Sequence, residues 1–457
     1  MSRARTSGLL VVVVLAMTAA ALGGYAGARS VHSTRPAPTP SAMPTPAALQ
    51  NAARAPVDPG NPSAIPDRPA AVVSALTPGL AADALGPSVR VRVVDIESGI
   101  VLIDRGGSTP TAPASTAKLL TAAAVLTVHR PTDRIATSLV TDGSGTLVLV
   151  GGGDPTLSAA PTGTAARYDG AARLSDLARQ VRESKVPIRR IVVDDAAFAG
   201  PAVSPDWADE DVPSSYGAAI TAVMTDGGRT LPDDEIRSAT PDLDAGRSLA
   251  RLLGRTNLSV TRGRVTKSET RVVATVRSAQ ISTLVAQMLQ ESDNVIAECL
   301  ARQVALARGV AATFVGSAKA IRATVAGLGV DPGGQLVDGS GLAARDRVSP
   351  ATLVAVLRLA AVGTRAGLRA VISGLPVAGW SGTLADRFVS GRSRTGAGVV
   401  RAKTGTLTGV STLAGLVHDM DGRLLGFALV ADRAPATTPA ETALDSVVSR
   451  LSDCGCR

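Results

Sequence analysis

The alternation of apolar and polar residues predicts strands near both ends of the folded part of the chain. Residues 88–96 alternate apolar with charged positions, which is typical of a half-buried strand. Gly99 ends this pattern and residues 100–104 form a second short run, so the two runs predict a hairpin. Three further apolar runs predict strands over 399–403, 411–418 and 424–431.

Helices are predicted between these groups of strands. Residues 116–128 are rich in alanine and leucine and contain neither glycine nor proline, which favours a helix. Strands at both ends with helices between them predict an α+β domain whose sheet joins the N- and C-terminal segments. The remaining predicted elements are helices over 281–290, 294–308, 349–359 and 438–451 and short strands over 146–150 and 191–194.

The N-terminal residues predict an export signal followed by a spacer. Two arginines precede an apolar run over 9–22, and residues 26–28 offer a small-residue cleavage site. The run is short for a membrane span of about 20 residues, but an uncleaved signal anchor stays open as the alternative to a signal peptide over 1–28. Residues 29–68, rich in proline and alanine, predict a disordered linker. We therefore expect an extracytoplasmic protein, in the cell envelope or secreted, with membrane anchoring as an option.

Composition and charge favour a folded protein that does not bind nucleic acid. The chain has 457 residues, of which 45% are hydrophobic and 19% charged, so it can bury a sizeable core. The net charge is +9, but the arginines are scattered and aromatic residues make up only 2%. A nucleic-acid partner is therefore not expected, since such proteins gather basic residues in patches and stack bases on aromatic side chains.

Cysteine and histidine usage predicts neither a metal site nor a cofactor. The histidines are isolated, and neither an H-E-x-x-H nor a C-x-x-C pattern occurs. Cys299 lies in an apolar helical stretch and is expected to be a buried thiol. A bridge between Cys454 and Cys456 is conceivable, although it would close a very small loop.

Three short motifs carry the candidate chemistry. Residues 115–118 read S-x-x-K, residues 292–294 read S-D-N and residues 403–405 read K-T-G. Each motif alone is weak evidence, but the three in this order mark penicillin-binding proteins and serine β-lactamases. The predicted elements place S-x-x-K at the start of a helix and S-D-N between two helices, while K-T-G ends one strand and leads into another.

The S-x-x-K motif has the chemistry of an activated nucleophile. A backbone N–H of Ser115, at a helix N-terminus, would be free to face a developing oxyanion. Lys118 lies one turn further on the same helical face. Held near other cations and away from water, its amine would have a lowered pKa and could accept the serine proton. The alternative is structural, with Ser115 as a helix cap and Lys118 on a solvated face.

The other two motifs offer groups for proton transfer and substrate binding. Ser292 could relay a proton to a leaving amine and Asn294 could hold a substrate amide, although a loop and helix cap would use the same residue types. On the K-T-G strand a positive charge suits a substrate carboxylate, and a glycine lets a substrate approach the backbone. The strand's candidate binding residues are Lys403, Thr404, Gly405 and Thr406.

The chain resembles the D-alanyl-D-alanine carboxypeptidases of the penicillin-binding protein 4 type, which are low-molecular-mass class C penicillin-binding proteins. The resemblance runs from about residue 70 to 450 and includes residues 151–157 (GGGDPTL) and 338–342 (DGSGL), the latter leading to 348–350 (VSP). It implies a β-lactamase/transpeptidase-like core, an antiparallel sheet flanked by helices. The implied catalytic domain covers 69–144 and 276–457, with the inserted domain or domains at 145–275.

The resemblance also implies an activity. The enzyme would release the terminal D-alanine of peptidoglycan stem peptides through an acyl-enzyme and bind β-lactam antibiotics covalently, and some relatives also cut cross-links as DD-endopeptidases. The implied roles are Ser115 as nucleophile, Lys118 as base, Ser292 as proton relay, Asn294 as amide ligand, Lys403 and Thr404 as carboxylate ligands, and the backbone N–H groups of Ser115 and Thr406 as the oxyanion hole.

Two positions bear on recognition of the substrate's side chain. Where the family often has Ser-Arg after D-G-S-G-L, this chain has two alanines with Arg345 one place later, so an arginine subsite is not carried over. Asp211 falls near an acidic side-chain contact of some relatives.

The first alternative function is a serine β-lactamase. Class A β-lactamases use a glutamate between S-D-N and K-T-G for deacylation, and the only glutamate in that interval here is Glu298, on the helix directly after S-D-N. The second is a non-catalytic cell-wall-binding scaffold.

Overall fold

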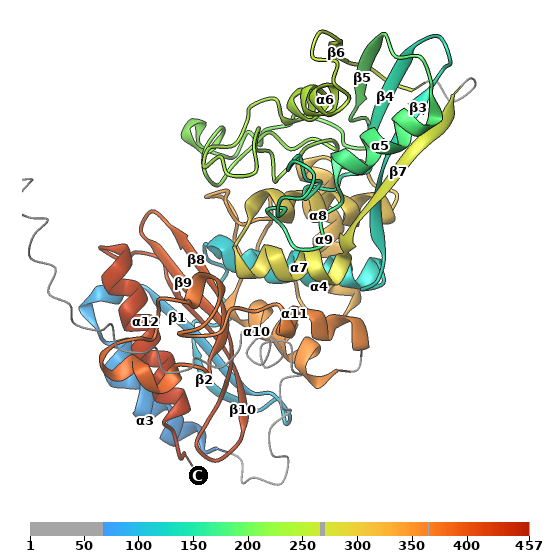
Figure 1. Cartoon of the computed structure of the whole chain (residues 1–457). Helices are drawn as coiled ribbons and strands as arrows, with labels where there is room; N and C mark the ends of the chain where they lie inside the picture. Colours follow the sequence, from blue (N-terminus) through green and yellow to red (C-terminus); the bar gives the residue numbers. More distant parts are fainter. Residues whose placement is uncertain (1–66, 266–269, 364, 457) are drawn as a thin grey trace, which may run out of the picture. The chain divides into compact units, whose positions relative to one another are not determined.

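Two five-stranded sheets organise the part of the chain that the structure describes (Figure 1). The structure is a computed structural model, and its described residues are 67–265, 270–363 and 365–456. The predicted export signal over 1–28 and nearly all of the linker over 29–68 lie outside these residues.

The first sheet joins the two ends of the described chain. Its strand order is β2-β1-β10-β9-β8, and every neighbouring pair is antiparallel. The N-terminal hairpin pairs with the C-terminal strands, because Val89 on β1 lies opposite Ala431 on β10. The predicted α+β class, with an antiparallel sheet shared by both ends, is therefore confirmed. The strands are β1 (Val89–Asp95), β2 (Val101–Arg105), β8 (Arg401–Leu407), β9 (Val410–His418) and β10 (Leu424–Ala431).

Helices cover both faces of this sheet. Figure 1 shows α3 and α12 together on one side, and their apolar side chains share a core with β1, β9 and β10. The other face packs against α10, behind which the remaining helices form a second core. The helices are α3 (Pro69–Leu80), α4 (Lys118–Val128), α7 (Ile281–Gln290), α8 (Asn294–Ala307), α9 (Phe314–Gly327), α10 (Pro350–Val362), α11 (Arg369–Ser373) and α12 (Thr437–Ser452).

The second sheet has the order β6-β5-β4-β3-β7 and a small core of its own. It includes β3, which begins at Arg134, and β7, which ends at Gln280, and these two strands pair with each other. A division at 145 and 275 would thus cut through a hydrogen-bonded sheet, and the boundaries expected from the sequence need to move outward. The elements are β3 (Arg134–Thr141), β4 (Thr146–Gly151), β5 (Arg190–Asp194), β6 (Ser259–Arg262), β7 (Arg271–Gln280), α5 (Leu174–Ser184) and α6 (Pro241–Leu252).

Two motif segments differ from their predicted elements. The strand expected over 399–403 is β8, which continues to Leu407 because its pairing with β9 extends to Leu407 opposite Val410. The K-T-G motif therefore lies inside a strand and not at its end. Before α4, a short 3-10 turn, Ala114–Ala117, holds the motif serine. The other 3-10 turns are Asp83–Leu85, Asp209–Asp211, Ala366–Leu368, Gly382–Leu384 and Gly391–Gly396.

Cys299 on α8 is a buried free thiol, as predicted, and Cys454 and Cys456 form a disulfide. Among the described residues no single helix has the length and apolarity to cross a membrane; α10 and the following Ala366–Ser373 meet those criteria only when the bent pair is taken together.

Candidate active site

The three sequence motifs meet at one cavity of about 1160 Å³. The S-x-x-K motif reaches it from the turn before α4, the S-D-N motif from the turn before α8, and the K-T-G motif from β8 at the edge of the first sheet. The motif residues that line the cavity are Ser115, Ser292, Asn294, Thr404, Gly405 and Thr406.

Ser115 sits in a strained turn at the cavity wall. The preceding residue, Ala114, has a φ of 45°, a left-handed conformation that residues with a Cβ rarely adopt and that is common at functional sites. The turn is also tightly enclosed, because a Cβ on Gly341 would lie 1.9 Å from the Ala114 carbonyl oxygen. The surroundings thus fix the backbone that presents Ser115 to the cavity.

Lys118 is fully buried behind Ser115 and donates to three oxygen atoms. Its Nζ lies 2.8 Å from Ser115 Oγ, 2.6 Å from Asn294 Oδ1 and 2.8 Å from the Ser340 carbonyl oxygen. A charged ammonium has three N–H donors, whereas the neutral amine has two and a lone pair. When Lys118 is neutral, Asn294 and Ser340 can accept its two N–H bonds, and the lone pair then faces Ser115 Oγ.

Burial is the main cause of the lowered pKa of Lys118, which is about 8. Contrary to the expectation of nearby cations, the strongest charges acting on Lys118 are carboxylates, and these raise its pKa. Desolvation outweighs them, so the amine loses its proton within reach of neutral pH. The carboxylates are Asp338, Asp293, Glu298 and Asp346.

The D-G-S-G-L loop holds the Ser340 carbonyl against Lys118. Asp338 is buried, and its Oδ1 accepts hydrogen bonds from the backbone N–H groups of Ser340 and Gly341 at 3.0 and 2.7 Å. Its Oδ2 accepts a bond of 2.8 Å from Trp207 Nε1, in the segment between β5 and β6. The sequence singles out this loop by resemblance only, and its part in positioning the lysine appears in the structure.

The S-D-N turn is held by residues that the sequence analysis did not identify. Asp293 is buried and caps α8 by accepting from two of its backbone N–H groups at 2.9 and 3.0 Å. Arg237 Nη2 and the Tyr168 hydroxyl also donate to Asp293, each at 2.8 Å. The positive charge of Arg237 and these hydrogen bonds hold the pKa of Asp293 well below its usual range despite burial. Both donors come from the region between β4 and β6, where no periodic pattern marks them.

Lys403 lies behind the cavity wall. Its side chain is fully buried, and its Nζ donates to Ser292 Oγ at 2.9 Å and to the Thr404 carbonyl oxygen at 2.8 Å. Burial lowers the pKa of Lys403 well below its usual value, and the positive charges of Lys118 and Arg387 lower it further. Among the described residues that line the cavity, Thr404 and Thr406 are present and Lys403 is not.

Gly405 permits the close approach of β8 to the nucleophile turn. A Cβ at this position would lie 2.2 Å from Thr412 Oγ1 and 2.9 Å from the Ser115 backbone nitrogen. Every larger residue would push the strand away from Ser115. Beside it, the Thr406 hydroxyl donates to Glu441 Oε1 at 3.0 Å and the Thr404 hydroxyl to Thr383 Oγ1 at 2.8 Å.

Three acidic residues from the segment between β5 and β6 form an acidic rim of the cavity. Asp206, Glu210 and Asp211 line the same cavity as the motif residues. Arg345 forms an ion pair with Asp206 on an exposed surface, which partly neutralises the rim. The remaining carboxylates give this side of the cavity a negative character.

Comparisons with known proteins identify relatives over almost the whole chain. The family model "D-Ala-D-Ala carboxypeptidase 3 (S13) family" matches residues 73–235 and 233–451. The carboxypeptidase DacB of Mycolicibacterium smegmatis is 41% identical over 461 residues, covering 98% of this chain and 96% of that protein. A carboxypeptidase of Mycobacterium tuberculosis is 40% identical over 394 residues, covering 85% of each chain.

Among solved structures, penicillin binding protein 4 of Haemophilus influenzae shares the fold. It superposes with a TM-score of 0.70 at 22% identity, covering 84% of this chain and 99% of that one. The core fold that the family resemblance implies is thus confirmed. Together with the extent of the family match, these findings establish that the chain belongs to the D-Ala-D-Ala carboxypeptidase 3 (S13) family and is a D-Ala-D-Ala carboxypeptidase, a hydrolase.

Proposed function

We propose that Ser115 is the acylated nucleophile with which this carboxypeptidase removes the terminal D-alanine from peptidoglycan stem peptides. The observation that carries the proposal is the 2.8 Å hydrogen bond between Lys118 Nζ and Ser115 Oγ at the cavity wall. A nucleophile with an adjacent buried amine is the arrangement that covalent catalysis by serine requires. The family membership supplies the substrate class.

Acylation follows from this geometry. Neutral Lys118 takes the proton of Ser115 as Oγ bonds to the carbonyl carbon of the penultimate D-alanine. The backbone N–H groups of Ser115 and Thr406 stabilise the oxyanion. The C–N bond then breaks, and the proton held by Lys118 passes through Ser292 to the leaving amine of the terminal D-alanine. Lys403 donates to Ser292 Oγ, which leaves the hydroxyl hydrogen of Ser292 directed at the cavity. Water then hydrolyses the ester and restores Ser115.

The two ends of the substrate bind to different walls of the cavity. To bind the terminal carboxylate, the hydroxyl hydrogens of Thr404 and Thr406 turn away from Thr383 and Glu441. Lys403 provides positive charge from behind them. An incoming carboxylate raises the pKa of Lys403 and favours its charged form. Asn294 Nδ2 donates one of its hydrogens to the Tyr216 carbonyl oxygen at 3.2 Å. Its other hydrogen can be donated to a substrate carbonyl oxygen. The acidic rim, with Asp211, suits a cationic group further along the stem peptide.

β-Lactams acylate Ser115 in the same way, because they present a strained amide to the same groups. The structure of penicillin binding protein 4 of Haemophilus influenzae has been solved in a complex with a β-lactam.

Fast deacylation, which would make the protein a β-lactamase, has less support than carboxypeptidase activity. Glu298 is fully buried, where its carboxylate accepts from Gly339 N–H at 2.8 Å and pairs with Arg302. It therefore does not face the cavity as a deacylation base would.

Export to the cell envelope completes the proposal. The signal over 1–28 and the linker over 29–68 would place the enzyme outside the cytoplasm, near its polymeric substrate, either released or held at the membrane by an uncleaved signal. Cell fractionation followed by mass measurement of the mature N-terminus distinguishes the two states. A full-length protein confined to the cytoplasm would contradict this part of the proposal.

The central test combines active-site labelling with product analysis. Ser115→Ala should abolish covalent labelling by benzylpenicillin and the release of D-alanine from purified muropeptides, both followed by mass spectrometry. Ser144→Ala, which changes an exposed serine remote from the cavity, is the matched control and should behave as the parent. Equal labelling of Ser115→Ala and parent would refute the nucleophile. The same spectra show whether cross-linked dimers are cleaved. A parent that neither labels nor releases D-alanine would support the non-catalytic scaffold alternative.

A further inference from the structure

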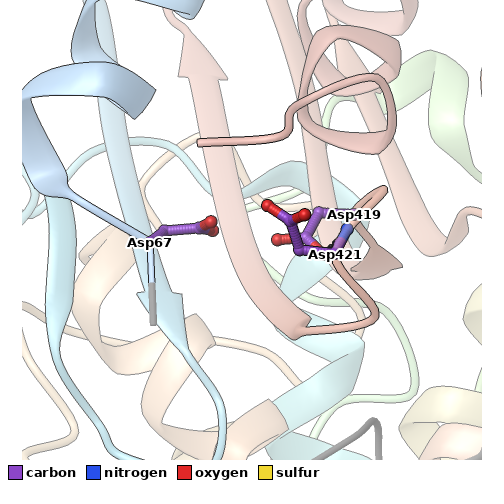
Figure 2. Close-up of side chains that lie close together, drawn as sticks. All are labelled: Asp67, Asp419 and Asp421. Atoms are coloured by element: carbon purple, nitrogen blue, oxygen red, sulfur yellow. Dashed lines mark hydrogen bonds between the residues drawn. The ribbon is translucent and has the colours of Figure 1, made fainter. Parts of the chain in front are cut away.

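A cluster of three carboxylates lies outside the active site, where the N-terminal end of the described chain meets the β9–β10 turn. Asp67 precedes α3, and Asp419 and Asp421 belong to the turn (Figure 2). The three side chains each offer an oxygen, and these oxygens all lie within 4.8 Å of one another. Figure 2 shows the Asp67 carboxylate pointing toward the other two.

The Asp67 carboxylate is buried without a hydrogen-bond partner. The residue is only 3% exposed, and neither of its oxygens is hydrogen-bonded to any described residue. Asp419 is 6% exposed, and its Oδ1 accepts from the backbone N–H groups of Asp421 and Arg423 at 2.9 and 2.8 Å. Its Oδ2 is buried and has no described partner. An unpaired buried carboxylate is costly, and two that face each other are more so.

The neighbouring arginine is already engaged. Arg423 donates to both oxygens of Asp95, from Nε and Nη2, each at 2.6 Å. In this bidentate pair the positive charge of Arg423 is balanced by the negative charge of Asp95.

We propose that Asp67, Asp419 and Asp421 bind one divalent cation of the calcium class. Carboxylate oxygens are the ligands that Ca²⁺ prefers, at about 2.3–2.6 Å, so two of them on one ion can be up to about 4.6–5.2 Å apart. The carboxylate oxygens all lie within 4.8 Å of one another and are therefore close enough to share one ion. Mg²⁺ demands near-ideal octahedral geometry at about 2.0–2.1 Å and usually keeps several waters, so a site of three carboxylates suits Ca²⁺ better.

The bound ion would tie three chain segments together. The Arg68 backbone N–H donates to the Cys456 carbonyl oxygen at 2.8 Å, and the Met420 N–H donates to that of Cys454 at 3.1 Å. The disulfide-bearing C-terminal segment therefore already bridges Asp67 and the β9–β10 turn. A cation at the carboxylates would complete this junction and fix the point at which the linker leaves the folded region. The site is distinct from the catalytic cavity, since none of its ligands lines that cavity.

The test measures thermal unfolding and metal binding of the full chain. In the parent, 5 mM CaCl2 should raise Tm relative to EDTA, and calorimetric titration should show one equivalent of Ca²⁺ with Kd in the range of about 0.1–1 mM, as for extracellular calcium modules. Asp67→Asn should weaken binding at least tenfold and lose the Ca²⁺-dependent Tm shift. In EDTA this variant should be at least as stable as the parent, because it removes a repulsive charge and no hydrogen bond.

Two controls make the result specific. Glu183→Gln, which changes an exposed acid on α5, should keep the full calcium response. Benzylpenicillin labelling of Asp67→Asn should match the parent, so the cation site and the proposed catalytic roles can fail independently. A parent with no Ca²⁺-dependent Tm shift would overturn the proposal, as would an unchanged shift in Asp67→Asn. An equal response to Mg²⁺ would overturn the assignment to calcium.

Discussion

Lys118 on α4 donates from Nζ to Asn294 Oδ1 on α8 at 2.6 Å, so the second motif orients the amine of the first. This contact gives Asn294 a role beyond substrate binding. Together with the Ser340 carbonyl oxygen, it determines which direction the amine lone pair takes when Lys118 is neutral.

Replacing Asn294 should therefore slow acylation even for substrates that do not need its amide. In Asn294→Ala, the loss of a hydrogen bond to a charged group is worth about 1.5–3 kcal/mol, or roughly 10- to 150-fold in the acylation rate constant. Asn294→Asp should also raise the pKa of Lys118, because it puts a negative charge beside the amine. Stopped-flow acylation by nitrocefin across pH measures both effects. An Asn294→Asp profile that coincides with the parent's would rule out control of Lys118 by Asn294.

The acylation rate should rise with pH through the pKa of Lys118, about 8. Because the neutral amine is the active form, its fraction grows from roughly a tenth at pH 7 to roughly nine tenths at pH 9, which gives about a tenfold increase in rate. The second-order rate constant for benzylpenicillin acylation, measured from pH 6 to 9.5, checks this. A rate that is flat between pH 7 and 9 would mean that Lys118 is already neutral at pH 7 or is not the base.

Lys403→Ala should reduce carboxypeptidase activity by about 10- to 150-fold, the loss of a contact worth roughly 1.5–3 kcal/mol. The side chain is buried behind Ser292 and Thr404, so it has two possible effects. If its charge supports carboxylate binding, the loss should be larger for acid-ended than for amidated peptides. If it acts only through Ser292, both peptides should lose equally. The ratio of kcat/KM values for the two peptides, in parent and variant, separates the effects as a double-mutant cycle does.

Arg237→Ala should destabilise the protein and slow acylation together. The variant leaves Asp293 buried with an uncompensated charge, which costs about 3–5 kcal/mol, and loosens the turn that carries Ser292 and Asn294. Tyr168→Phe removes a single hydrogen bond to Asp293 and should cost about 1–3 kcal/mol. Denaturant unfolding and nitrocefin acylation provide the two readouts.

The matched control for this prediction is Arg247→Ala on α6. Arg247 also pairs with an aspartate, Asp244, at 2.7 Å, but its side chain is about half exposed, so its loss should cost at most about 1 kcal/mol. If Arg237→Ala were as mild as Arg247→Ala, the Asp293 contact would not hold the S-D-N turn.

Local patterns in the sequence were sufficient for the core elements and for the identity of the motif residues. The alternation over 88–96 depends only on neighbouring positions, and β1 forms there; α7 spans the predicted 281–290. The second sheet was harder to predict, because β7 leaves Val272 63% exposed and its alternation is blurred. Short motifs predict chemistry because they too depend only on neighbouring positions. The S-x-x-K spacing places the serine hydroxyl and the lysine amine one helical turn apart.

Only the tertiary structure decided what surrounds those groups. Lys118 and Lys403 are buried because helices and strands distant in sequence close over them, and burial is what lowers their pKa values. The contact of Arg237 with Asp293 likewise joins separate regions of the chain, as does the approach of Asp67 to Asp419. Desolvation and the pairing of charges depend on which distant segments meet, and no local pattern of residues records this.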